Sequence, residues 1–423
     1  MFAIPIFFGP IVIDLLMGYF RKTHTYRLSD LITNLSLSAL SIMAGLAVSG
    51  ATYALYHYIN QHYAVMSLSP ARIGTWVFAF LGYDFLYYCA HRAHHRVSIL
   101  WASHVVHHSG EDCNFGLALR QSITGQLSFW IFFLPLAALG VGLQIYLIVI
   151  LVQLVYQYLI HNEYVKDLGW LEWVLVTPSQ HRVHHSRNHQ YLDKNYGNIL
   201  VLWDRLFGTY QRELPTVPVV YGLSKPVRTW DPLTINFHYY LQLKRKLQLC
   251  KSLGEKMRCL FAYPAWMPEH VDTTVFADEH DNVSSRNFTK YAPTVPASAM
   301  GYAVWQLFTM FLGFSMLLWQ MGTLSLPLIV LYTLFVLSSA YATGGILDAK
   351  PIFWRWELIR QAVILVVAFT WFWWVHAPVQ PLAGLPFGYA LLSIGYLLWF
   401  RSDFLQSDRQ KPGMCYEDAR TCR

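Results

Sequence analysis

Histidines between positions 91 and 185 are the side chains of this sequence best suited to chemistry. The chain of 423 residues has 18 histidines. Three groups read His-x-x-His-His and begin at His91, His104 and His181. Histidines three and four residues apart lie on one face of a helix, so each group can direct several imidazoles to one place. Imidazole is a good ligand for iron, copper, zinc and nickel. The spacing therefore predicts a metal centre.

The number of candidate ligands indicates two ions. The predicted metal ligands are His91, His95, His104, His107, His108, His161, His181, His184 and His185. A zinc site uses three or four protein ligands, and a single zinc would leave half of these donors unused. Nine donors suit two ions with four or five ligands each and leave room for dioxygen or water. His94 and His189 lie beside the boxes off their helical face, and their role stays open.

Composition places these histidines in a membrane protein. The chain is 55% hydrophobic and 13% charged, which is too apolar for a soluble enzyme of this size. About 20 apolar residues are needed to span a bilayer as a helix. We expect spanning segments at about 1–20, 30–58, 72–90, 127–160, 300–320, 323–346, 361–377 and 384–400. The predicted fold is therefore all-α, a polytopic integral membrane helix bundle.

Loop charges predict the orientation of this bundle, because short cytoplasmic loops carry an excess of Lys and Arg. Basic residues follow the first and third spans, whereas 60–71 contains none. This pattern predicts a cytoplasmic helical cap carrying the histidines, with 127–160 as a hairpin that bends at 140–142. A bacterial inner membrane or the endoplasmic reticulum would fit. The net charge of +7 suits anionic headgroups, and no recognition motif indicates nucleic acid.

The sequence divides into five predicted regions. These are N-terminal transmembrane helices at 1–70, a catalytic region at 71–215, a polar cytoplasmic connector at 216–299, C-terminal transmembrane helices at 300–402 and a cytoplasmic tail at 403–423. The C-terminal helices contain no cluster comparable with the histidine boxes. Their role and the oligomeric state are left open.

The order of the boxes resembles that of a known enzyme superfamily. HxxxH at 91–95, followed by HxxHH at 104–108 and 181–185, is similar to the fatty acid hydroxylase and sterol desaturase superfamily of integral-membrane di-iron enzymes. The flanking Leu-Arg-Gln-Ser at 119–122 and Asp-Lys-Asn-Tyr-Gly at 193–197 favour its ether-lipid branch, the alkylglycerol monooxygenases. The resemblance is clear over about residues 80–210, and outside them only the hydropathy profile matches.

The resemblance implies a reaction and its cofactors. Two iron ions and dioxygen would hydroxylate a lipid C–H bond. The expected bond is at the ether α-carbon of an alkylglycerol taken from the bilayer, and the products would be a fatty aldehyde and glycerol. In the ether-lipid branch a Glu beyond the second box is associated with a reduced pterin such as tetrahydrobiopterin, and Glu111 has that position here. The other interpretation of Glu111 is a solvated loop carboxylate.

Other polar residues are candidates for orienting the ligands, because carboxylates commonly accept the free N–H of a metal-bound imidazole. Asp84 lies two helical turns before His91, and a charge in a membrane segment is costly without a role, so we expect it to orient a histidine; the alternative is a pairing with a nearby Arg. Asp193 and Asn195, with Lys194 and Asp204, would orient ligands, grip a headgroup or form a turn network. Trp101 and Trp203 are interpreted as membrane-interface residues.

Two rival functions stay open. A sterol or fatty-acyl desaturase or hydroxylase, supplied by an electron-donor protein, would use the same metals on another lipid. A metal transporter or sensor would instead place histidines along a path across the bilayer. The boxes gather at one predicted face, which favours the enzyme.

Overall fold

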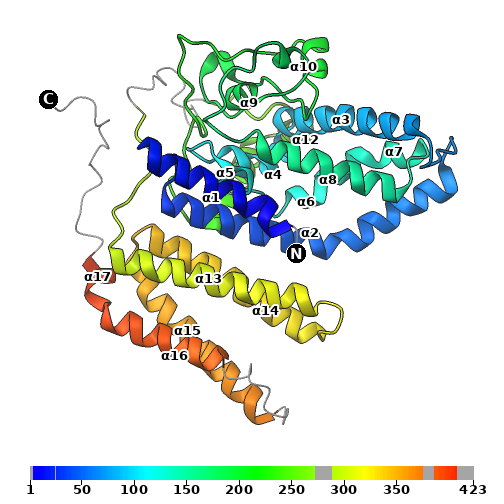
Figure 1. The fold of residues 1–423 in the computed structure, drawn as a ribbon. Coiled ribbons are helices and arrows are strands. Elements are labelled where there is room, and N and C mark those ends of the chain that lie inside the picture. Colours follow the sequence, from blue (N-terminus) through cyan, green and yellow to red (C-terminus); the bar gives the residue numbers. More distant parts are fainter. Residues whose placement is uncertain (1–2, 24, 272–287, 375–384, 407–423) are drawn as a thin grey trace. The chain divides into compact units, whose positions relative to one another are not determined.

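The computed structural model describes residues 3–23, 25–271, 288–374 and 385–406. Helices form its regular structure, and the only strand-like pairings in these ranges are the isolated bridges Leu175–Leu200 and Ser186–Tyr221. The chain forms two compact units. The first contains residues 1–227 and 234–288, and the second contains 228–233 and 289–423 (Figure 1). This division into two units does not test the five predicted regions, which stay a prediction.

The longer helices of the first unit come from both ends of its sequence range. They are α1 (Ala3–Arg21), α2 (Leu28–Tyr63), α3 (Ile73–Arg96), α4 (Ser98–His108), α8 (Leu143–Leu159), α11 (Pro232–Leu249) and α12 (Leu253–Phe261). Aromatic pairs join α2, α3 and α8 through a shared core. Tyr56 stacks on Tyr146 with ring centroids 4.2 Å apart, and Tyr83 stacks on Phe133 at 4.3 Å. Such stacked, buried rings fix the helices that carry the histidines.

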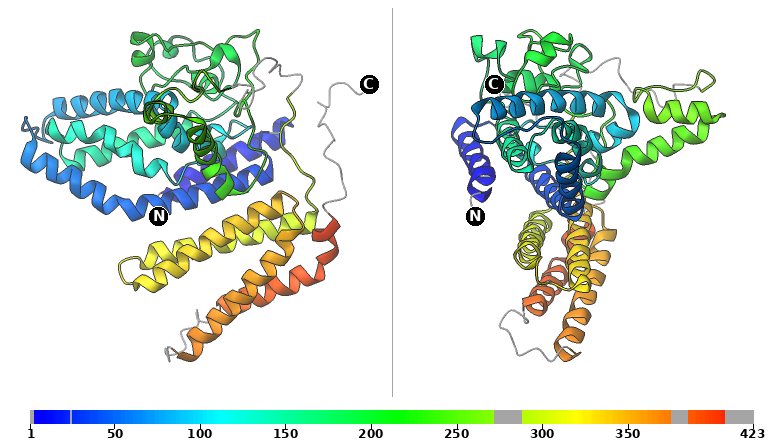
Figure 2. Two further views of the ribbon diagram at one scale, coloured as in Figure 1. Left: turned by 180° about the vertical axis from the view of Figure 1, so that it is seen from behind. Right: turned by 90° about the vertical axis from the view of Figure 1, so that its right-hand side faces the viewer.

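Short helices complete the first unit around the histidine-bearing segments (Figure 2). They are α5 (Phe115–Ala118), α6 (Gly125–Ser128), η1 (Phe129–Phe133), α7 (Leu134–Ala138), η2 (Gly169–Trp173), α9 (Pro178–His184), η3 (His189–Tyr191) and α10 (Leu202–Leu206). The predicted bend at 140–142 is confirmed, because α7 ends before it and α8 begins after it. Gly140 has φ +94°, and a Cβ there would lie 2.1 Å from the Met66 carbonyl oxygen, so glycine is required.

Helices occur in all the predicted spanning segments, but fewer of them are long and apolar enough to cross a bilayer. Among the described residues these are α2, α13 (Ala297–Gln320) and α14 (Leu326–Leu347). Helix α15 (Ile352–Trp374) carries Arg355, Glu357 and Arg360. The segment 127–160 is broken into short pieces before α8, whose length is 17 residues. The prediction of eight spans is therefore reduced to three candidate spans in the described part of the chain.

The second unit is a bundle of α13, α14, α15, α16 (Leu385–Trp399) and the short α17 (Arg401–Gln406). Helix α13 packs on α14, and α15 packs on α16. Arg360 is buried among them and pairs with Glu357 at 2.6 Å. Its guanidinium also donates to Gln306 Oε1 at 2.5 Å, Ser339 Oγ at 2.8 Å and the Tyr389 hydroxyl at 2.9 Å. This polar network joins all four long helices, and no sequence pattern predicted it.

Candidate metal centre

A break between α3 and α4 brings the first two histidine boxes together. Val97 lies between the helices with extended backbone angles, φ −115° and ψ 118°, so the chain changes direction within one residue. The last turns of α3 carry His91 and His95. Helix α4 carries His104, His107 and His108. The two helices then pack on each other. Their histidines point to a common centre because each set lies on one helical face.

The third box comes from α9 and the remaining histidine from the end of α8. Pro178 occupies the first turn of α9, where its missing N–H costs nothing, and Thr177 precedes it in an extended conformation. His181 and His184 follow on the helix. His161 lies just beyond α8, and its Nδ1 is 2.7 Å from the Gln157 carbonyl oxygen. Eight of the nine predicted ligands are buried, and His104 is partly exposed.

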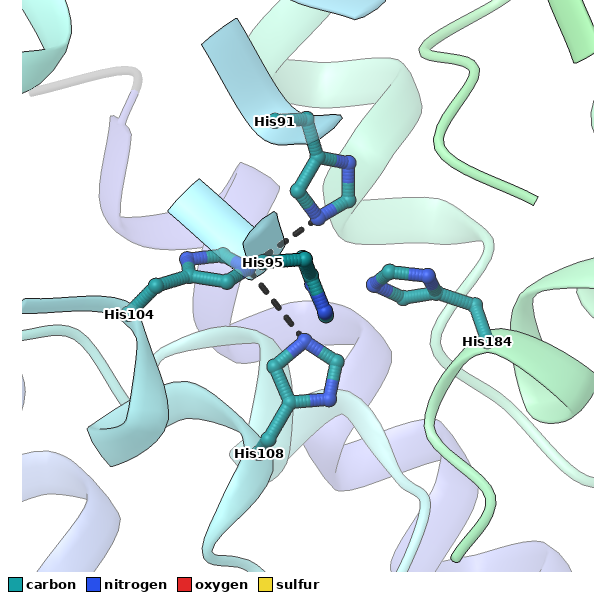
Figure 3. Close-up of side chains that lie close together, drawn as sticks. All are labelled: His91, His95, His104, His108 and His184. Carbon is teal, nitrogen blue, oxygen red and sulfur yellow. Dashed lines mark hydrogen bonds between the residues drawn. The ribbon is translucent and has the colours of Figure 1, made fainter. Parts of the chain in front are cut away.

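All nine predicted ligands meet in two adjacent groups. The five-histidine cluster contains His91, His95, His104, His108 and His184, and the four-histidine cluster contains His107, His161, His181 and His185. Within each cluster the candidate ligand nitrogens lie within 4.8 Å of one another. In the five-histidine cluster, His91 Nε2 and His108 Nε2 lie 3.0 and 3.2 Å from His104 Nε2 (Figure 3). Each cluster could therefore hold a metal ion.

Backbone carbonyls fix how four of these rings are protonated and oriented. The Nδ1 atoms of His91, His107 and His184 lie 3.0, 3.1 and 2.9 Å from the carbonyl oxygens of Tyr196, Arg120 and Lys194, and His161 has the same relation to Gln157. A carbonyl oxygen can only accept, so Nδ1 carries the proton in each ring. The Nε2 lone pair of a neutral imidazole then faces the cluster.

The contact between His107 and His161 shows that the cluster needs a cation. Both rings have their proton on Nδ1, yet their Nε2 atoms lie 3.3 Å apart. Two lone pairs at that distance repel each other unless a proton or a metal ion binds between them. Other inward nitrogens, His95 Nε2 and His184 Nε2, are buried without a hydrogen-bond partner. The residues present therefore fit bound metal ions.

Burial disfavours a proton as that cation. The pKa values of His107, His181 and His185 lie well below the usual 6.5, chiefly because burial penalises the charged ring and then because neighbouring histidines repel it. Burial also lowers the pKa of His184 to about 4. The rings are consequently neutral at pH 7, the state in which imidazole binds a transition metal.

The Asp-Lys-Asn-Tyr-Gly segment supplies two of the orienting carbonyls. Asp193 and Asn195 have φ +58° and +57°, a left-handed conformation that Asp and Asn tolerate better than most residues. The residues Lys194 and Tyr196 direct their carbonyls to two rings of the five-histidine cluster. Asn195 also bonds to the backbone of Gln211, and Asp193 pairs with Arg96 at 2.8 Å. The predicted turn network is thus present, and it positions ligands through the backbone.

Asp84 and Asp204 accept backbone N–H groups of residues 196–200, the segment that follows Asn195. Asp84 accepts the N–H groups of Ile199, Leu200 and the Trp203 ring at 2.8–3.2 Å, so its carboxylate anchors the loop rather than a histidine ring. This differs from the predicted direct contact with a ring. Asp204 accepts the Tyr196 N–H at 2.8 Å and thereby places the carbonyl that His91 uses. The sequence did not predict that Asp204 positions His91 through the backbone of Tyr196.

The other candidates lie outside the two clusters. His94 bonds to the Ala90 carbonyl oxygen and Ser128 hydroxyl, and His189 is exposed at the start of η3. Glu111 is buried, with its carboxylate 3.5 Å from Arg27 Nη1. Trp101, which we expect at the membrane interface, packs its ring against His95 and His108 at centroid distances of 5.1 and 5.6 Å.

Comparison with known proteins agrees with this geometry. Residues 76–209 match the fatty acid hydroxylase family. Over 366 residues the chain is 35% identical to alkylglycerol monooxygenase of Danio rerio and 32% identical to that of Homo sapiens, covering 86% of this chain and 81% of each relative. An ornithine lipid hydroxylase of Rhizobium tropici is 33% identical over 140 residues, 30% of this chain and 39% of that protein. No solved structure is significantly similar. The chain is therefore a lipid-hydroxylating monooxygenase and belongs to the fatty acid hydroxylase family, among the alkylglycerol monooxygenases.

Proposed function

We propose that this membrane protein holds one iron ion in each histidine cluster and hydroxylates the ether α-carbon of an alkylglycerol. One oxygen atom of O2 enters the C–H bond, and the resulting hemiacetal separates into a fatty aldehyde and glycerol. The other oxygen atom leaves as water, with two electrons and two protons from a reduced pterin. The observation that supports two ions is the pair of adjacent clusters with inward lone pairs.

The ions would supply the activation of dioxygen, and the chain supplies ligands and a dry environment. The five-histidine and four-histidine clusters differ by one protein ligand, so the second leaves more room for an external ligand. The rings of Trp101 and Tyr196 pack against the five-histidine cluster and exclude water from its sides. The imidazole Nδ1–H groups on backbone carbonyls prevent the ligands from rotating.

The reductant in this proposal is tetrahydrobiopterin or another reduced pterin beside Glu111. Glu111 follows the second histidine box by three residues and is buried, unlike a solvated loop carboxylate. A carboxylate can accept N–H groups of a pterin ring. An electron-donor protein is the alternative, and it would accompany the second candidate function, hydroxylation or desaturation of a sterol or fatty-acyl chain.

The proposed location is a multi-pass position in the membrane with the centre on the cytoplasmic side. Three helices are long and apolar enough to span, and basic residues such as Arg92 and Arg96 adjoin the histidines. Short basic loops stay in the cytoplasm. Lipid substrate would enter from the bilayer.

The test is to purify the full chain in detergent, measure iron per chain and follow aerobic turnover of an alkylglycerol with reduced pterin. Two iron ions, oxygen consumption and release of fatty aldehyde are expected. A glycerol ester of the same chain length has no ether carbon and should give no aldehyde. One zinc ion per chain without oxygen consumption would overturn the di-iron proposal. Turnover of sterol or acyl substrates alone would select the second function.

A further inference from the structure

Arg120 holds His107 from two sides. Its carbonyl oxygen accepts the His107 Nδ1–H at 3.1 Å, and its Nε donates to the carbonyl oxygen of the preceding residue, Val106, at 3.0 Å. The Val106 carbonyl lies in the last turn of α4, where it also accepts the Ser109 N–H and the Ser109 hydroxyl, and Arg120 Nε reaches the same hydroxyl at 3.0 Å. Arg120 thus fixes both the end of α4 and the ring that projects from it.

The other end of the guanidinium is fixed by α2. Arg120 Nη1 donates to Asn34 Oδ1 at 2.8 Å and lies 3.7 Å from Asp30 Oδ1. Asn34 in turn donates to Asp30 at 2.8 Å, one helical turn away. All three side chains are at most 3% exposed. A charge buried to this degree is costly unless it is paired and has a role.

We propose that Arg120 is a positioning residue which couples α2 to the ion of the four-histidine cluster; this inference rests on the proposed metal centre. The coupling runs from Asp30 and Asn34 through the guanidinium to the Val106 carbonyl, and through the Arg120 carbonyl to the His107 ring. The coupling should affect only the four-histidine cluster, because His107 belongs to that cluster and not to the other. The ring bonds that orient the five-histidine cluster come from Lys194 and Tyr196 instead.

The shape of the guanidinium matters as much as its charge. Nε and Nη1 point to separate acceptors, Val106 and Asn34, and a planar fork spans both at once. A lysine ammonium keeps the charge opposite Asp30 but has no second, fixed donor. Arg120→Lys and Arg120→Gln are therefore expected to impair the cluster to a similar degree. Asp30→Asn leaves the Asn34 and Val106 contacts in place and should have a smaller effect.

The test uses cobalt(II) titration of metal-free full-length protein in detergent, which requires neither iron nor turnover. Wild type should bind two ions. In Arg120→Gln and Arg120→Lys one binding step should weaken by about 10- to 100-fold, the usual effect of removing a group that orients a ligand, while the other step stays unchanged. Gln121→Ala, a change at the exposed neighbouring residue, is the matched control and should titrate as wild type.

The outcomes separate this inference from the proposed function. Unchanged binding of both cobalt ions in the Arg120 variants would overturn it, and so would equal weakening of both steps, which would mean general loss of structure. Thermal melting with circular dichroism identifies the latter, and Asp30→Asn provides a milder variant of the same link. A wild type that binds two cobalt ions but neither retains iron nor turns over ether lipid would overturn the proposed function and leave the positioning role measurable.

Discussion

The two units each bury a polar centre, and the two centres balance their charges in different ways. In the first unit nine histidines face one another, and the ligand groups contain no carboxylate. In the second unit Arg360 pairs with Glu357, and its remaining donors reach Gln306, Ser339 and Tyr389. The histidine centre consists of neutral acceptors and has no cationic side chain among its candidate ligands. The arginine centre contains its own cation and anion.

The difference indicates which centre binds something from outside the chain. Buried polar groups without partners are costly, so the inward lone pairs of His107 and His161 are stable only with an added ion. Arg360 and Glu357 already pair with each other. Replacement of one partner alone would leave the other as an unpaired buried charge, which destabilises the fold. The first centre is built for binding, and the second holds α13–α16 together.

Removal of a ligand should give the largest effect. His181 Nε2 lies 2.8 Å from His161 Nε2 and 3.1 Å from His185 Nε2, at the middle of the four-histidine cluster. His181→Ala is expected to lose at least one metal ion per chain and all turnover above background. Metal analysis and an oxygen-consumption assay measure both. The exposed His189 is the control, and His189→Ala should keep metal and activity. Retention of both by His181→Ala would refute the assignment of the third box.

Acid should destabilise the metal-free protein through the first centre. The folded-state pKa of His184 is about 4 and those of His107, His181 and His185 are also lowered, against 6.5 unfolded. Below pH 6.5 the unfolded chain binds protons that the folded chain does not, so stability is full above that pH and falls between about 6.5 and 4. Thermal melting of chelator-treated protein across this range measures the loss.

The second unit provides the internal comparison for acid. Its described residues contain no histidine. Hydrogen exchange at pH 5 should therefore accelerate in α4 and α9 and change little in α13 and α14. Equal acceleration in both units would contradict a histidine origin for the acid effect.

Replacement of Arg360, the buried cation of the second unit, should lower stability and leave the metal content unchanged. Arg360→Leu leaves Glu357 unpaired at 0% exposure, and the free energy of unfolding is expected to fall by about 3–5 kcal/mol. The metal content per folded chain should stay that of wild type. The double variant Glu357→Leu/Arg360→Leu removes both charges and should recover most of the loss in thermal melting. A single variant that is as stable as wild type would show that the pair is not effectively buried.

The smallest effect is expected for one hydroxyl of the same network. Tyr389 donates to Gln306 Oε1 at 2.6 Å and accepts from Arg360 and Gln361 at 2.9 Å. Tyr389→Phe should reduce the free energy of unfolding by about 1 kcal/mol, because Gln306 and Arg360 retain other partners. A loss as large as that of Arg360→Leu would mean that the hydroxyl, and not the ion pair, holds the network.

The sequence predicted the ligands better than it predicted their neighbours. All nine predicted histidines enter the two clusters. Helical spacing places the eight box histidines on common faces, whereas His161 joins them from the end of α8. Their division between clusters could not be predicted, since it depends on how α3, α4, α8 and α9 pack. The same holds for Arg360 and Tyr389, which are 29 residues apart and meet only in the folded bundle.

Backbone groups explain the remaining gap between sequence and site. The carbonyls of Arg120, Gln157, Lys194 and Tyr196 orient the rings, and every residue type has a carbonyl, so no side-chain pattern could mark them. A trace remains at Asp193 and Asn195, whose left-handed backbone favours those residue types. Asp84 was expected at a ring, but its acceptors serve a loop that lies 115 residues further along the chain.

The division of neighbouring histidines between the two clusters has a consequence for the distance between the ions. His107 and His108 are adjacent in the chain, as are His184 and His185, and in both pairs one residue serves each cluster. Consecutive Cα atoms are about 3.8 Å apart by covalent geometry. Ions bound in the two clusters would therefore be linked through two peptide bonds, which would limit how far apart they can lie. Insertion of a single residue between His184 and His185 would separate the ions, whereas a shift of the whole helix would carry both along.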